Sequence, residues 1–269
     1  MIYKKILLNT INENASENSY IEMYLHEEHE GVFKERPAIL IVPGGGYFSL
    51  APLEAGTVAL RYASEGFNTF VLWYGINQEY PVPHQDLLIA LMHIKLHKNE
   101  YGLDGKYFLM GFSAGGHLVG SYSYLYKELA TKFDVNEEFL RPDAIILSYP
   151  VITMFENTHI RTRDIISGFN ELNYAKLSIE RNITSDYPPT FVWHTITDTG
   201  VSVYNSKCLE EALKANDVIH EAHYFNFLDH GRSVMTMEIK EQFKPFTEEE
   251  LVCKTWVDLS INFLMKNFY

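Results

Sequence analysis

The stretch Gly111-Phe112-Ser113-Ala114-Gly115 decides how this chain is interpreted, because of the residues on either side of it. Residues 106–110 form a short, mostly apolar run of strand length, and residues 116–122 suit the start of a helix. A tight turn between strand and helix holds a serine in a strained conformation that exposes its hydroxyl. Glycine on both sides lets the two elements approach without a Cβ clash. The pattern therefore predicts a nucleophilic serine at position 113.

Composition limits the class of protein. The chain has 269 residues and 46% hydrophobic content, which suits one large folded α/β domain over residues 1–269. Its net charge of −13 argues against nucleic acid or an anionic membrane as a partner, because both are bound by basic surfaces.

Three further features of the sequence bear on the cellular compartment of the protein. The two cysteines, Cys208 and Cys253, are interpreted as reduced thiols of an intracellular protein, although a disulfide between them stays open. The lysines at positions 4 and 5 precede only three apolar residues, too few for a signal peptide. No run of eighteen apolar residues is present, so we expect no membrane span and a cytoplasmic protein.

Apolar runs of strand length alternate with stretches of helical pattern along the chain. Strands are expected at 2–8, 19–25, 37–42, 67–74, 106–110, 143–149, 190–195 and 219–225, and helices at 52–65, 83–98, after Ser113, 202–215 and 248–266. This alternation predicts a mostly parallel sheet covered by helices on both faces. Residues 151–187 interrupt it, and we interpret them as a small helical insert, a partial lid within the one domain.

A serine hydroxyl becomes a nucleophile when a base takes its proton and an acid orients that base. In doubly wound sheets such groups follow the carboxyl ends of strands. Asp198 comes three residues after the strand expected at 190–195, and His230 follows the strand expected at 219–225. We therefore predict that Ser113 is the nucleophile, His230 the base and Asp198 the acid.

Other residues remain alternatives at this point. Asp186 and Asp229 compete with Asp198 for the role of the acid, and His220 and His223 compete with His230 for that of the base. His117 comes one helical turn after the serine, where a packing or hydrogen-bonding role beneath the turn is favoured over that of a base.

The loop Pro43-Gly44-Gly45-Gly46-Tyr47 follows the strand expected at 37–42. Consecutive glycines let backbone N–H groups converge on a developing oxyanion, so we predict donors from Gly45, Gly46 and Ala114. A phosphate-binding loop is disfavoured because the Lys-Ser/Thr of a P-loop is missing. Tyr47 is a candidate substrate-binding residue, with core packing as the alternative.

His93 and His97 stand four residues apart in an expected helix, a spacing that suits a metal. No third ligand and no zincin-type glutamate accompanies them, so a solvated helix face is favoured. We predict no metal and no cofactor.

Several motifs together resemble the acetyl esterase / acetyl xylan esterase-like branch of the α/β-hydrolase superfamily, which is related to the hormone-sensitive-lipase-like esterases. The matching segments are Pro43–Tyr47 with Glu54 seven residues on, Gly111–Leu118, Pro188–His194 followed by Asp198, and Asp229-His230-Gly231. The order Ser113, Asp198, His230 is also that of α/β-hydrolases. Departures are Ser202, where the family has proline, and Leu228, where it has glycine.

The resemblance implies an α/β-hydrolase fold and a serine carboxylesterase that acts on short acyl esters, commonly acetyl esters of carbohydrates. The expected partner is a small-molecule ester, such as an acetylated sugar, and homo-oligomerisation stays open. An amidase, an arylformamidase or a small peptidase with the same triad remains an alternative, as does a non-catalytic binding protein on this fold. The role of residues 232–250 is not predicted.

Overall fold

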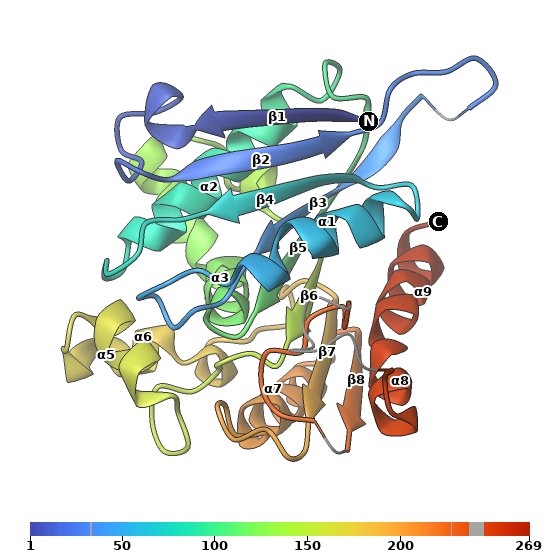
Figure 1. Ribbon diagram of the computed structural model, residues 1–269. Helices are drawn as coiled ribbons and strands as arrows, with labels where there is room; N and C mark the ends of the chain where they lie inside the picture. Colours follow the sequence, from blue (N-terminus) through green and yellow to red (C-terminus); the bar gives the residue numbers. More distant parts are fainter. Residues whose placement is uncertain (33, 227, 237–244) are drawn as a thin grey trace.

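A single twisted sheet organises the molecule (Figure 1). The computed structural model describes residues 1–32, 34–226, 228–236 and 245–269. Within these residues eight strands pair in the order β1-β2-β4-β3-β5-β6-β7-β8. The strands are β1 Ile2–Leu7, β2 Tyr20–Leu25, β3 Arg36–Val42, β4 Asn68–Trp73, β5 Leu103–Phe112, β6 Ala144–Ser148, β7 Thr190–Thr195 and β8 His220–Phe225.

The sheet is antiparallel at one edge and parallel elsewhere. β1 pairs with β2, and β2 with β4, in antiparallel register, whereas every pairing from β4 through β3 to β8 is parallel. Parallel neighbours require crossover connections, which the helices between the strands supply. The expected mostly parallel sheet, and with it the α/β-hydrolase fold, is confirmed.

Helices cover both faces of the sheet. α2 and α3 pack on one face, and α1 and α9 on the other (Figure 1). The helices are α1 Gly56–Ala63, α2 Val82–Leu96, α3 Ala114–Phe133, α4 Glu137–Leu140, α5 Ile160–Ser167, α6 Tyr174–Leu177, α7 Tyr204–Ala215, α8 Glu248–Lys254 and α9 Trp256–Phe268. None of the helices in the described ranges combines the length and apolar character that crossing a bilayer requires.

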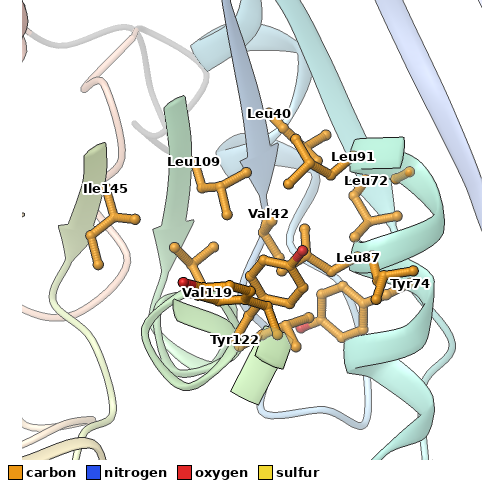
Figure 2. Packing of buried hydrophobic residues seen from close by; sticks show 14 of the residues in the cluster. Leu40, Val42, Leu72, Tyr74, Leu87, Leu91, Leu109, Val119, Tyr122 and Ile145 are labelled. Carbon is orange, nitrogen blue, oxygen red and sulfur yellow. The ribbon is translucent and has the colours of Figure 1, made fainter. Parts of the chain in front are cut away.

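The continuous apolar runs of the inner strands arise because both of their faces are buried. Along β3, Leu40 and Val42 point into the core under α2 and α3, whereas Ile39 and Ile41 point into the core under α1 and α9. Figure 2 shows the first core, where Leu40 and Val42 meet side chains of α2 and α3. The inner strands are thus clamped between two apolar layers.

Two expected helices are divided in the structure. The helix expected at 52–65 begins as a 3₁₀ turn, Pro52–Glu54, and turns into α1 only after Ala55, whose φ and ψ of −113° and −106° are not helical. The helix expected at 248–266 consists of α8 and α9 with Thr255 between them. Residues 151–187 contain α5, α6 and 3₁₀ turns, and we call this segment the insert.

The packing of α9 generates a stability prediction. Trp256 is fully buried, stacks on Trp193 with ring centroids 4.9 Å apart, and donates from Nε1 to the Ser233 carbonyl at 2.9 Å. Trp256→Ala should therefore lower the free energy of unfolding by about 3–5 kcal/mol, measured by urea denaturation. Met265→Ala, at an exposed position of the same helix, should change it by no more than about 0.5 kcal/mol. Equal effects of the two substitutions would contradict this packing account.

Candidate active site

Ser113 stands at the turn between β5 and α3 in a backbone conformation that is unfavourable for a residue with a side chain. Its φ is 52° and its ψ is −117°. Its N–H donates to the Ser148 carbonyl at 2.9 Å, and its own carbonyl accepts from the N–H of Val151 at 3.2 Å. A Cβ on Gly111 would lie 2.2 Å from the Gly115 carbonyl oxygen, so glycine is required there. The neighbouring strand and the start of the insert thus hold the strained turn in place.

Three of the predicted site residues meet at the carboxyl edge of the sheet. Ser113 Oγ lies 2.8 Å from His230 Nε2, and His230 Nδ1 lies 2.7 Å from Asp198 Oδ2. The other carboxylate oxygen of Asp198 accepts from the N–H groups of Gly200 and Val201, each at 2.8 Å. The Asp198 side chain is therefore held on both oxygens and aimed at the imidazole.

The charge on Asp198 is stabilised by a second histidine. Burial alone raises the pKa of its carboxyl, but hydrogen bonds from His194 and His230 outweigh burial and hold that pKa well below its usual range. His194 Nε2 lies 3.3 Å from Asp198 Oδ2 and 2.9 Å from the Val201 carbonyl. An ionised Asp198 keeps the proton of His230 on Nδ1, which leaves the Nε2 lone pair toward Ser113.

The alternative acids and bases have other partners. Asp229 accepts from the backbone N–H and the hydroxyl of Thr199, and Asp186 pairs with Lys127. His223 lies 3.5 Å from Glu221, and His220 Nδ1 contacts its local backbone at the Val218 carbonyl. These contacts place none of the four beside the hydroxyl of Ser113.

The glycine loop lies directly against the serine. A Cβ on Gly44 would come within 2.8 Å of Ser113 Cβ, so only glycine allows this approach. Within the described residues, the N–H groups of Gly45, Gly46 and Ala114 have no acceptor. Both glycines line the same cavity as Ser113, and Ala114 begins α3. These three predicted donors are thus available to a bound ligand.

A buried network joins the glycine loop to the loop of His230. Glu54 accepts from the Gly44 N–H and from the Tyr149 hydroxyl, each at 2.7 Å. The Tyr149 oxygen accepts from the Ser233 N–H at 3.1 Å, and its ring packs edge-on against His230 at 4.9 Å. Burial raises the pKa of the Glu54 carboxyl, and the two hydrogen bonds partly offset this.

Tyr47 does not line the cavity. Its side chain is fully buried, and its hydroxyl lies 2.8 Å from His117 Nδ1. His117 Nε2 in turn lies 2.8 Å from the Leu177 carbonyl of the insert. This corrects the expectation that Tyr47 contacts substrate, because its aromatic ring is needed in the core beneath the turn. Its neighbour Phe48 lines the cavity instead.

The cavity at Ser113 has a volume of about 320 Å³. Besides the serine, His230 and the glycine loop, it is lined by apolar side chains, by Glu54, Gly200 and Gly231, and by one histidine of the insert, His159. The sequence offered no signal for the contacts that His159 and Tyr149 make at the site, because both residues reach it from segments distant in sequence from Ser113, Asp198 and His230. The apolar lining residues are Phe48, Ala51, Pro52, Leu53 and Val201.

No cluster of three or more His, Cys, Asp or Glu side chains suited to a metal occurs among the described residues. His93 Nε2 instead lies 2.8 Å from the Tyr101 hydroxyl, and the His93 and His97 rings contact each other at 4.1 Å.

The burial of His117 makes stability depend on pH. Burial lowers the pKa of its imidazole to about 4, whereas the unfolded chain titrates near 6.5. Between these values the unfolded state binds more protons, so the free energy of unfolding should fall as the pH falls. Urea denaturation at pH 7.5 and 4.5 should show roughly 2–3 kcal/mol of this loss from His117 alone.

The variant His117→Gln isolates that contribution. It should lose less stability than the wild type between the two pH values, whereas His29→Gln, at an exposed histidine, should behave like the wild type. An unchanged loss in His117→Gln would refute the assignment.

Comparisons with known proteins agree with this fold. The BD-FAE family profile matches residues 21–213. Endo-1,4-beta-xylanase B of Butyrivibrio fibrisolvens is 33% identical in an alignment of 246 positions that covers 84% of this chain and 37% of that protein. This chain therefore spans little more than a third of the length of that relative.

Two solved structures match over nearly their whole length. An acetyl ester-xyloside bifunctional hydrolase from Caldicellulosiruptor lactoaceticus is 30% identical, with a TM-score of 0.80 and coverage of 97% of each chain. The carboxylesterase Cest-2923 from Lactobacillus plantarum WCFS1 is 27% identical, with a TM-score of 0.84 and coverage of 99% of this chain and 98% of the other. The predicted esterase resemblance is confirmed, and the chain belongs to the BD-FAE family of α/β-hydrolases.

Proposed function

We propose that this chain is a serine carboxylesterase that hydrolyses short-chain acyl esters, with acetyl esters of carbohydrates as its substrates. The observation that carries the proposal is the hydrogen-bonded line from Ser113 Oγ through His230 to Asp198, with distances of 2.8 and 2.7 Å. Ser113 and His230 line the same cavity as Gly45 and Gly46 of the glycine loop. Such an arrangement activates a hydroxyl beside a ready site for an oxyanion.

The first half of the reaction forms an acyl-enzyme. His230 Nε2 takes the proton of the Ser113 hydroxyl as the oxygen attacks the ester carbonyl. The N–H groups of Gly45, Gly46 and Ala114 stabilise the negative charge that develops on the carbonyl oxygen. The imidazolium of His230 then protonates the departing alcohol, while Asp198 stabilises its positive charge.

The second half releases the acid. His230 takes a proton from water, and the resulting hydroxide attacks the acyl carbonyl at the same oxyanion site. The tetrahedral intermediate collapses, and the Ser113 oxygen regains its proton from His230. The carboxylic acid leaves, and the enzyme returns to its starting protonation state.

The cavity supports a preference for short acyl groups. Its volume of about 320 Å³ is near the lower end of the range for small-molecule sites. Ala51, Pro52 and Val201 line it and offer apolar contacts to a small acyl chain. Support for an acetylated sugar comes from a solved relative described as an acetyl ester-xyloside hydrolase.

Removing the nucleophile gives the decisive test of this proposal. Wild type and Ser113→Ala are compared on p-nitrophenyl acetate, butyrate and octanoate, with circular dichroism as the folding control. We expect acetate to be the best substrate and Ser113→Ala to lower kcat by at least about 10³-fold, because no covalent intermediate can form. Hydrolysis retained by the folded variant would show that Ser113 is not the nucleophile.

The acid is tested by a matched pair of variants. Asp198→Asn should lower kcat on p-nitrophenyl acetate by up to about 10⁴-fold, because an amide favours the wrong tautomer of His230. Asp229→Asn removes a charge beside the same histidine and should change kcat less than about threefold, because Asp229 bonds Thr199 rather than the imidazole. The reverse ranking would assign the acid to Asp229.

A further inference from the structure

His159 brings a polar group of the insert to the cavity of Ser113. It directly precedes α5, whose first turn it caps by accepting from the Thr162 N–H. It also lines the cavity together with Ser113, His230 and Phe48. The catalytic scheme above uses His230 as its base and leaves His159 without a role. Glu54 also lines the cavity, but its carboxylate is hydrogen-bonded to Gly44 and Tyr149, so His159 is the polar lining side chain that needs its own explanation.

The hydrogen bonds of His159 determine which ring nitrogen carries the proton. Nδ1 lies 3.3 Å from the backbone nitrogen of Thr162, which can only donate, and 2.7 Å from the Thr162 hydroxyl. Nδ1 is therefore an acceptor, and the proton of the neutral ring is on Nε2. Within the described residues, both hydrogen bonds of the His159 ring are made by Nδ1, and Nε2 has no partner.

Two further features keep this donor in place and uncharged. The Arg161 guanidinium lies 3.5 Å above the Phe48 ring, so the start of α5 is held against the glycine loop. Burial, followed by the nearby charges of His230 and Arg161, lowers the pKa of the His159 imidazole. The ring is therefore neutral at pH 7 and offers one N–H donor.

We propose that His159 Nε2–H donates a hydrogen bond to a hydroxyl oxygen on the alcohol part of the substrate, next to the ester. This inference rests on the proposed esterase function and makes His159 a specificity-determining residue for polyhydroxylated alcohols. An acetyl methyl group has no acceptor for such a donor, and the acyl oxygen is bound by the glycine loop. The hydroxyls of a sugar are the remaining acceptors in an acetylated carbohydrate.

Selectivity follows from the cost of an unpaired donor. When an apolar alcohol displaces water from the cavity, Nε2–H loses its partner and gains none. When a sugar hydroxyl takes that place, the hydrogen bond is restored. A site of this kind discriminates against the analogue that lacks the hydroxyl more than it favours the natural group.

The test compares a matched pair of sugar esters. One is a monoacetylated methyl xylopyranoside with a free hydroxyl beside the ester, and the other is its deoxy analogue at that position. p-Nitrophenyl acetate serves as a substrate without sugar hydroxyls. The variant is His159→Asn, because its side-chain oxygen can still cap α5 while the donor is withdrawn from the cavity. Ile160→Ala, at an exposed position of the same helix, is the control.

We expect the wild type to prefer the hydroxylated ester to its deoxy analogue by about three- to tenfold in kcat/KM. His159→Asn should abolish that preference without lowering kcat/KM on p-nitrophenyl acetate, because the donor that an apolar alcohol leaves unpaired is gone, and Ile160→Ala should match the wild type. A preference that persists in His159→Asn, or an equal loss on all three esters, would overturn the assignment. Absence of Ser113-dependent hydrolysis in the wild type would instead overturn the proposed esterase function and this inference with it.

Discussion

The strained turn at Ser113 is the constraint on which the rest of the site depends. A residue with a side chain at φ 52° is stable only where its surroundings leave it no alternative. β5 and α3 meet so closely here that a Cβ on Gly111 would collide with the Gly115 backbone, and the glycine loop approaches from the other side. The same crowding packs Gly44 against the serine, and Gly45 and Gly46 line the same cavity as Ser113.

Hydrogen bonds between buried polar groups fix the relative position of the two loops that flank Ser113. Glu54 and Tyr149 are both buried, and neither would be tolerated in an apolar core without partners. Their hydrogen bonds join the Gly44 backbone to the loop that carries His230, so the two sides of the cavity share one network. Apolar packing alone is not directional and would leave the relative position of these loops less defined.

The insert contributes two residues to the surroundings of Ser113. The Leu177 carbonyl accepts from His117 beneath the turn, while His159, which directly precedes α5, lines the cavity. α5 and α6 contact each other and lie together at the lower left of Figure 1. A segment that interrupts the strand–helix alternation in the sequence thus packs against the turn at Ser113 and contributes one side chain to the lining of the cavity.

The sequence by itself determined the fold class, the strands and the residues that meet as Ser113, Asp198 and His230. Continuous apolar runs of strand length and the strand–turn–helix motif are local patterns, so both can be recognised in a single sequence. It could not exclude Asp229 as the acid or place Tyr47, because adjacency in sequence says nothing about side-chain direction. Only the tertiary structure shows that Asp198 contacts His230 Nδ1, that Tyr47 is buried, and that His159 lines the cavity. Contacts between distant segments arise from packing that no local pattern encodes.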